Sequence, residues 1–176
     1  MSFKLRQMTI NDVSALAALH VETFNETHGK NRNGPNVELR QYQWEKLFQE
    51  EDKNWFCIVI EDEHGKLIGF AKGQPYEHDD LPEFAGELNK IYLLNKYHKL
   101  GLGRQLICHV AHQFVRRGIS SMLLFGDEKN QANKFYEKMG ATKLFGNNGE
   151  FHGGYGWKDL QKLIDNYSES DGLEKL

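Results

Sequence analysis

The sequence predicts one α/β (α+β) domain in which helices flank a single mixed sheet. Its 176 residues are enough for one domain that buries roughly 70% of its unfolded surface. Strand-like and helix-like segments alternate along the chain, with no repeat and no linker. Residues 122–125 are wholly apolar, as in a short strand that is buried on both faces of a sheet.

The N-terminal part of the chain predicts a strand followed by two helices. Residues 3–8 alternate between polar and apolar, which indicates the strand. Thr9 and Asp12 have the spacing of a capping box, and the apolar residues after them recur at helical spacing. The polar stretch 28–36, which contains Gly and Pro, ends this helix. A second helix is predicted over 37–49, with Leu39, Tyr42, Leu47 and Phe48 facing inward.

The middle of the chain predicts a hairpin, a further strand and a long helix. Residues 55–60 and 67–73 are apolar segments joined by a polar turn, as in a hairpin. After the acidic loop 77–83, residues 87–94 form another strand. A helix then runs over 101–118, where two arginines and a glycine are ordinary stop signals.

The C-terminal part continues the alternation of strands and helices. After the strand at 122–125, a helix is predicted over 130–139, with Gly140 at its end. Two more strands are expected around 141–145 and 155–158. The polar tail 166–176 is expected to be frayed, so the predicted domain spans residues 1–165.

Composition and charge argue against several classes of protein. The 22 basic and 25 acidic residues leave a net charge of −3, which does not suit a general nucleic-acid binder. No run approaches the ~20 apolar residues of a membrane span, and the N-terminus lacks the apolar region of a signal peptide. Cys57 and Cys108 lie in apolar segments and are expected to be buried thiols, as in a reducing compartment. We therefore expect a cytoplasmic protein that binds neither nucleic acid nor a membrane.

The segment 93–104 predicts an anion-binding loop. An apolar strand leads into a short loop with two glycines, Gly101 and Gly103, and a helix begins there. Helix N-termini present unpaired N–H groups and partial positive charge, and glycines let the backbone approach phosphate oxygens closely. A tight turn without a ligand is the alternative. The Gly-Lys-Ser/Thr ending of a Walker loop and the third glycine of a dinucleotide fingerprint are both absent.

Two motifs resemble those of the Gcn5-related N-acetyltransferases (GNAT). Residues 98–103, His-Lys-Leu-Gly-Leu-Gly, resemble the family's Gln/Arg-x-x-Gly-x-Gly/Ala loop, with His98 in place of Gln or Arg. Residues 130–141 resemble the family's Asn-…-Ala-x-x-Phe-Tyr-Glu-x-x-Gly-Phe, with Ala141 at the final position. The two motifs occur in the family's order, separated by one helix and one strand, and the resemblance covers nearly the whole chain.

The resemblance implies a mostly antiparallel GNAT-like sheet and acetyl-CoA as co-substrate. It implies transfer of an acetyl group to a primary amine by direct attack, and no metal. The backbone of Ile91, Tyr92 and Leu93 would pair with the pantetheine arm, and Asn130 would contact the cofactor. The pyrophosphate would be held by the amides of Lys99, Leu100, Gly101, Leu102, Gly103 and Arg104.

The resemblance also implies two catalytic side chains. Tyr136 would act as the general acid, because a phenol with a pKa near 10 can protonate a thiolate with a pKa near 8.5. Glu87, at the start of the central strand, resembles in position the glutamate that some family members use as a base. The alternative for Tyr136 is an aromatic side chain that only packs in the core, and the alternative for Glu87 is a solvated carboxylate at the end of a strand. A backbone N–H near Leu93 would stabilise the oxyanion.

The acceptor and some alternatives stay open at this point. A small-molecule amine or a peptide amine would fit, and the resemblance does not decide whether the chain forms a homodimer. A non-catalytic CoA-binding sensor and an enzyme for another acyl-CoA are the rival functions. The loop 77–83 is expected to be solvated and not to bind metal. With Glu22 and Glu26 it leads to the hypothesis that acidic side chains border the acceptor and favour a cationic amine.

Overall fold

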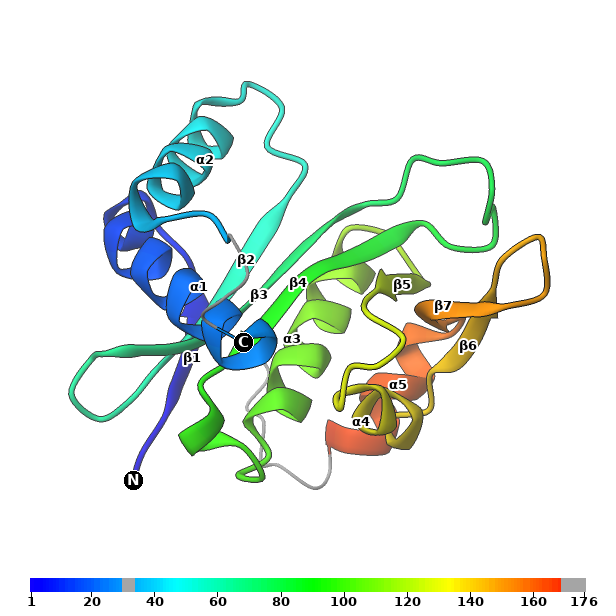
Figure 1. The fold of residues 1–176 in the computed structure, drawn as a ribbon. Helices are drawn as coiled ribbons and strands as arrows, with labels where there is room; N and C mark the ends of the chain where they lie inside the picture. Colours follow the sequence, from blue (N-terminus) through cyan, green and yellow to red (C-terminus); the bar gives the residue numbers. More distant parts are fainter. Residues whose placement is uncertain (30–33, 169–176) are drawn as a thin grey trace. The chain divides into compact units, whose positions relative to one another are not determined.

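The computed structural model describes residues 1–29 and 34–168. Residues 30–33 of the expected break between the first two helices, and 169–176 of the expected tail, lie outside the described residues. The elements in chain order (Figure 1) are β1 Lys4–Gln7, η1 Ile10–Asp12, α1 Val13–His28, α2 Val37–Gln49, β2 Phe56–Glu61, β3 Leu67–Pro75, β4 Gly86–Leu93, η2 Asn95–Tyr97, α3 Leu102–Arg116, β5 Met122–Phe125, α4 Asn133–Lys138, β6 Thr142–Phe145, β7 Phe151–Trp157 and α5 Leu160–Ser168.

The described strands form one mixed sheet in the order β1-β2-β3-β4-β5-β7-β6. The pairs β1–β2, β5–β7 and β6–β7 are antiparallel. The pair β4–β5 is parallel, with Gly86 opposite Met122 and Glu87 opposite Leu123. The predicted α/β fold on a mixed, mostly antiparallel sheet is thereby confirmed.

Contacts within the chain group it into two units. Unit 1 consists of Met1–Lys72 and Lys90–Leu106, and unit 2 consists of Gly73–Asn89 and the chain from Ile107 onward. The elements β3, β4 and α3 therefore each contribute residues to both units. That residues 1–165 behave as one domain stays a prediction.

Unit 1 contains β1, η1, α1, α2, β2, η2 and the adjoining parts of β3, β4 and α3. The two helices α1 and α2 pack side by side (Figure 1). Leu16 and Ala17 of α1 and Val59 and Ile60 of β2 are fully buried. These are the apolar positions at helical spacing and the continuous apolar strand that the sequence shows, so burial of apolar surface explains both elements.

The inward face of α2 differs from the prediction. Leu39 and Tyr42 are predicted to face inward, but 45% and 56% of their surfaces are exposed. Trp44 is buried instead, with its ring 5.9 Å from Phe70 and 6.2 Å from Trp55. The prediction was wrong because an indole buries more apolar area than Leu or Tyr, and its burial sets the rotation of the helix.

Unit 2 contains β5, β6, β7, α4, α5 and the adjoining parts of β3, β4 and α3. Met122 and Leu123 of β5 are fully buried, as expected for a wholly apolar strand with neighbours on both sides. The helix α5 is not predicted by the sequence analysis, which places residues 166–168 in the frayed tail. Its apolar side chains at i, i+3 and i+4 are buried, and they are Leu160, Leu163 and Ile164.

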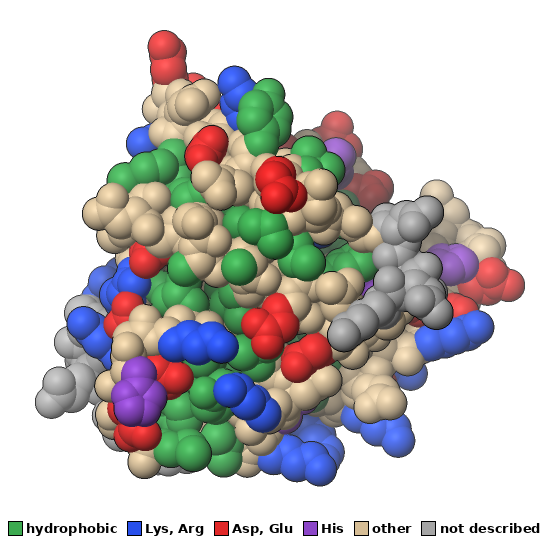
Figure 2. Space-filling view, turned by 60° about the vertical axis from the view of Figure 1, so that its left-hand side comes forward, with side chains coloured by type: hydrophobic (Ala, Val, Ile, Leu, Met, Phe, Trp, Pro, Cys, Tyr) green, Lys and Arg blue, Asp and Glu red, His purple; other side chains and the backbone are tan. Residues whose placement is uncertain are grey.

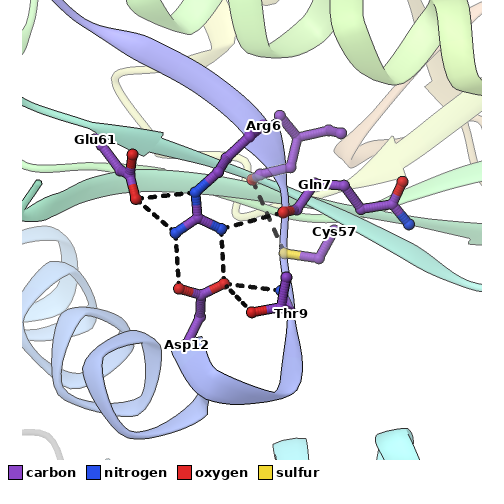
Figure 3. A network of polar contacts seen from close by, with 7 residues as sticks. Arg6, Gln7, Thr9, Asp12, Cys57 and Glu61 are labelled. Atoms are coloured by element: carbon purple, nitrogen blue, oxygen red, sulfur yellow. Dashed lines mark hydrogen bonds and ion pairs between the residues drawn. The ribbon is translucent and has the colours of Figure 1, made fainter.

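An ion-pair network joins β1, β2 and η1, which directly precedes α1 (Figure 3). Arg6 donates Nη1 and Nη2 to the two carboxylate oxygens of Asp12 at 2.7 and 2.8 Å. Its Nε and Nη2 donate to Oε1 of Glu61 at 2.9 and 2.6 Å. The Asp12 carboxylate also accepts from the N–H and hydroxyl of Thr9 at 2.8 and 3.0 Å. The capping-box spacing in the sequence thus supports a longer-range contact, which ties the first helix to the sheet.

We expect Asp12→Asn to lower the free energy of unfolding by about 1.5 kcal/mol at pH 7, a value that allows for solvent screening. The hydrogen bond from Arg6, followed by those from Thr9, lowers the pKa of Asp12 from 3.8 to about 2, against the effect of burial. Because the folded pKa is the lower one, this stabilisation is present above pH ~4 and lost as the pH falls toward 2. Urea unfolding at pH 7 and pH 3 measures the difference between wild type and variant, which should shrink at pH 3.

The matched control is Asp52→Asn, which removes an exposed carboxylate in the α2–β2 loop. It should leave the free energy of unfolding within about 0.5 kcal/mol of wild type at both pH values. A difference between wild type and Asp12→Asn that is the same at pH 7 and pH 3 would contradict the assigned role of the ion pair.

Neither a membrane-spanning helix nor a large patch of one charge is found among the residues that the structure describes and on the face in Figure 2. None of the helices within 1–29 and 34–168 has the length and apolar content needed to cross a membrane. Acidic and basic side chains both occur across the face in Figure 2, separated by hydrophobic and other side chains. Cys57 and Cys108 are buried, as predicted, and burial raises the pKa of the Cys57 thiol. This makes Cys57 a poor nucleophile.

Candidate active site

The predicted strand-loop-helix arrangement is present in unit 1. Strand β4 ends at Leu93, η2 follows, and α3 begins at Leu102. The backbone is left-handed at Lys99, with φ 63°, and at Gly101, with φ 82°. Glycine adopts this conformation without strain, which explains why Gly101 stands directly before the helix.

Consecutive backbone amides of this loop lack acceptors. Within the described part of the chain, no hydrogen bond is made by the N–H groups of five consecutive residues. The first N–H groups of a helix have no partner inside the helix, and the left-handed turn leaves the preceding ones unpaired as well. Together with the helix dipole they form a cradle suited to a phosphate group. The five residues are Lys99, Leu100, Gly101, Leu102 and Gly103.

The loop is held against β3, β4 and α1 by three hydrogen bonds. The ring Nε2 of His98 lies 2.9 Å from the carbonyl oxygen of Leu93. Since a carbonyl only accepts, Nε2 carries the proton in this contact. The amide of Asn95 donates to Oε2 of Glu26 at 2.9 Å, and that of Leu94 donates to Ile68 O at 3.0 Å. His98 thus fixes the loop to the end of β4, and Glu26 fixes the start of the loop to α1.

The three residues expected to pair with a pantetheine arm are the last three of β4. Ile91, Tyr92 and Leu93 are half-buried and directly precede the loop. The ring of Tyr92 lies 5.5 Å from that of Phe70 and 5.3 Å from that of His20. The predicted cofactor residues from Ile91 to Arg104 are thus contiguous in unit 1, at the strand end and the loop.

Glu87 lies in unit 2, at the second residue of β4. Its Oε2 accepts from Nε2 of Gln74 at 2.7 Å, and its Oε1 accepts from Nδ2 of Asn89 at 3.3 Å. Burial and the hydrogen bond to Asp80 raise the pKa of the neighbouring Tyr76 to about 12, and the charge of Glu87 adds to this. The half-buried carboxylate is therefore oriented by two amide side chains, which a freely solvated strand end would not show.

Tyr136 lies in α4 of unit 2 and is buried, with 7% of its surface exposed. Its ring lies 5.7 Å from that of Tyr155 and 6.3 Å from that of Trp157, the latter edge-on. The helix is fastened to β7 because Tyr155 donates its hydroxyl to Glu137 at 2.8 Å and Trp157 donates Nε1 to Met139 O at 2.9 Å. The packing fixes the position of the tyrosine ring, as a positioned proton donor requires.

The turn before α4 places Asn130 differently from the prediction of a helix over 130–139. The Asn130 side chain accepts from the amide of Ala132 at 2.9 Å, and α4 begins only at Asn133. Asn133 is 8% exposed and donates Nδ2 to the carbonyls of Asp127 and Glu128. Its buried Oδ1 has no donor among the described residues. Sequence reasoning missed Asn133, although its place beside Ala132 in the motif could have singled it out.

A second polar group was also missed by sequence reasoning. His20 of α1 is 1% exposed, and its Nδ1 has no hydrogen-bond partner among the described residues. The Nε of Arg40 in α2 is also buried and has no hydrogen-bond partner among the described residues. They lie on separate helices and belong to no motif, so no signal in the sequence links them.

Comparison with known proteins supplies a family and a fold. A model of the acetyltransferase (GNAT) family matches residues 16–141. The uncharacterized N-acetyltransferase YuaI of Bacillus subtilis is 28% identical over 168 residues, which is 90% of this chain and 95% of that protein.

Solved structures of several acetyltransferases have the same fold. The PaiA N-acetyltransferase of Thermoplasma acidophilum, in complex with coenzyme A, has a TM-score of 0.70 at 21% identity and covers 89% of this chain and 98% of its own. YncA of Salmonella typhimurium, with its cofactor acetyl-CoA, has a TM-score of 0.63 at 16% identity, with coverage of 91% and 95%. A GNAT acetyltransferase of Staphylococcus aureus Mu50 has a TM-score of 0.70 at 14% identity, with coverage of 90% and 99%.

Proposed function

The chain belongs to the acetyltransferase (GNAT) family, and from this premise we propose that it transfers an acetyl group from acetyl-CoA to a primary amine. The observation that carries the proposal is the row of unpaired amides from Lys99 to Gly103. A phosphate group would satisfy these amides, and coenzyme A carries a pyrophosphate. The structures of PaiA with coenzyme A and of YncA with acetyl-CoA support the same choice of co-substrate.

Acetyl-CoA would supply the thioester, and this chain would bind and orient it. The amides from Lys99 to Arg104 would hold the pyrophosphate, and the backbone of Ile91, Tyr92 and Leu93 would pair with the pantetheine arm. We assign Asn130 to the cofactor contacts as well, through the side-chain nitrogen, since its oxygen already accepts from Ala132. A backbone N–H near Leu93 would stabilise the negative charge on the carbonyl oxygen.

The amine must lose a proton before it attacks. An amine with a pKa near 10.4 is only about 0.04% neutral at pH 7, so a base contributes directly to the rate. Glu87 would accept this proton, directly or through water, and its bonds to Gln74 and Asn89 orient it for the task. The amine nitrogen would bond to the carbonyl carbon, the C–S bond would then break as the negative charge on the oxygen collapses, and Tyr136 would protonate the departing thiolate.

We expect saturating acetyl-CoA to raise the melting temperature by roughly 5–10 °C. Ligand at about 100 times its Kd adds about 2.7 kcal/mol to the free energy of unfolding, and a chain of this size gains about 2–4 °C per kcal/mol. Differential scanning fluorimetry measures the shift, and ATP and NADH serve as controls for phosphate binding in general.

The outcomes of this experiment separate the proposal from its rivals. A shift with acetyl-CoA alone, followed by thiol release with amines, supports the enzyme. A larger shift in melting temperature and faster turnover with another acyl-CoA would identify that acyl-CoA as the donor in place of acetyl-CoA. Binding without turnover of any amine would leave a CoA-binding module, and no shift at all would refute the proposed function.

A further inference from the structure

Unit 1 contains a buried histidine that the proposed chemistry does not use. The ring of His20 is surrounded by aromatic rings, at 5.2 Å from Phe70, 5.3 Å from Tyr92 and 6.3 Å from Trp44. Burial, with smaller effects from the charges of Arg40 and Lys90, lowers the pKa of His20 to about 3. The ring is therefore neutral at pH 7. Its buried Nδ1 lacks a hydrogen-bond partner in the described part of the chain, which is costly for a polar atom in an apolar environment.

Arg40 of α2 lies one turn before Trp44, whose ring is 6.3 Å from that of His20, and its guanidinium lacks an anion among the described residues. Its Nη1 donates to Oε1 of Gln43 at 3.1 Å, and its carbon lies 6.0 Å from the centre of the Phe24 ring. Burial lowers the pKa of Arg40, and the Tyr92 phenol only partly opposes this. Among the described residues no carboxylate pairs with it, and its buried Nε has no partner.

Arg6 in the same unit has a guanidinium whose charge is paired with carboxylates. It is bonded by the carboxylates of Asp12 and Glu61, at 2.7 and 2.6 Å. Nε and Nη2 of a guanidinium form an edge that matches the two oxygens of a carboxylate, and in Arg40 the nitrogen that already donates, to Gln43, is Nη1. One guanidinium beside a neutral imidazole suits a group with a single negative charge better than a phosphate dianion.

The position of the cluster connects it to the proposed reaction. Tyr92, whose ring contacts His20, immediately precedes Leu93 in β4. Leu93 is the residue whose backbone region we assign to the thioester carbonyl. The His20 ring therefore lies against the residue of β4 that directly precedes the proposed reaction centre.

We propose that His20 and Arg40 form the acceptor subsite, in which Arg40 binds a carboxylate of the amine substrate and His20 donates to it from Nδ1. The inference rests on the proposed function and specifies its substrate class as amines that carry a carboxylate, of which amino acids are the simplest. Acidic side chains near the amine end of such a substrate are compatible with this, because the amine is the cationic end.

The first test compares L-amino acids with their carboxamides as acceptors, with thiol release as the readout. The acids should have a kcat/KM at least roughly 30-fold higher, as expected when a buried charged hydrogen bond is made by one substrate only. Arg40→Gln should abolish this preference by raising KM for the acids and leave the carboxamides unchanged. Arg40→Lys should keep part of the preference that Arg40→Gln loses, since lysine keeps the positive charge but cannot donate two parallel hydrogen bonds to the carboxylate.

Lys46→Gln is the matched control, because it removes the same charge from an exposed position of the same helix. It should keep the wild-type preference. The melting temperatures of both variants with and without acetyl-CoA show whether each is folded and binds the co-substrate. Equal kcat/KM for acids and carboxamides in the wild type, or an equal loss for both in Arg40→Gln, would overturn the subsite while leaving the proposed function intact.

A binding measurement tests the subsite independently of turnover. N-acetyl-L-amino acids and their carboxamides are titrated by calorimetry into the protein without acetyl-CoA. Binding of the acids alone, lost in Arg40→Gln and kept in Lys46→Gln, supports the subsite. Equal binding of acids and carboxamides, or binding of neither, overturns it. Failure of the proposed function would instead show as a missing melting-temperature shift with acetyl-CoA.

Discussion

Replacing Tyr136 by phenylalanine should lower kcat by about 1,000-fold, within the range that a positioned proton donor contributes. The variant loses only the hydroxyl, so the ring contacts with Tyr155 and Trp157 and the packing of α4 should persist. Without the phenol, the thiolate must leave unprotonated or take its proton from water. The affinity for acetyl-CoA, measured by calorimetry, should stay within about 3-fold of wild type, since the Tyr136 hydroxyl is not among the groups that we propose to hold the cofactor.

Tyr42→Phe is the control for this experiment, because it removes a hydroxyl from a tyrosine with 56% of its surface exposed. It should not change kcat. If Tyr136→Phe instead keeps kcat within a few-fold of wild type, Tyr136 is a packed aromatic and another group protonates the thiolate. Loss of activity together with a large fall in melting temperature would also count against the catalytic role.

The second large effect is expected at Gly101. Gly101→Ala should weaken acetyl-CoA binding by about 100-fold, as a higher Kd in calorimetry and a smaller melting-temperature shift. Gly101 has a φ of 82°, which an L side chain adopts only with strain. A Cβ there would meet only Nη2 of Arg104, at 3.6 Å, so the protein has room for it. The steric conflict would instead be with the pyrophosphate that we propose the surrounding amides hold.

Gly118 provides a control for backbone strain. It follows the end of the same helix, has a φ of 78°, and a Cβ there would meet nothing within 4 Å. Gly118→Ala should therefore lower the free energy of unfolding by about as much as Gly101→Ala, roughly 1–2 kcal/mol. It should leave the Kd for acetyl-CoA unchanged. Equal Kd values for the two variants would show that Gly101 is only a turn residue.

Most elements could be predicted because their patterns are local. The wholly apolar strand β5 and the helix α2 have the predicted bounds, since strand and helix periods and the caps are properties of neighbouring residues. The helix α4 is shorter than predicted because the Asn130 side chain forms a turn with Ala132 instead of continuing the helix. The helix α5 was missed although its buried residues Leu160, Leu163 and Ile164 recur at helical spacing in the sequence, a local signal that could have predicted it.

In the candidate site, too, the local features could be predicted from the sequence and the long-range contacts could not. The sequence by itself determined the loop from Lys99 to Gly103, because a left-handed glycine before a helix leaves its amides unpaired whatever surrounds it. Only the tertiary structure decided that Trp44 and not Tyr42 is buried, and that the amide of Asn95 donates to Glu26 of α1. Only the tertiary structure brought together His20, Arg40 and Tyr92, which come from α1, α2 and β4. Contacts between residues far apart in the sequence depend on how whole elements pack, and no local period carries that information.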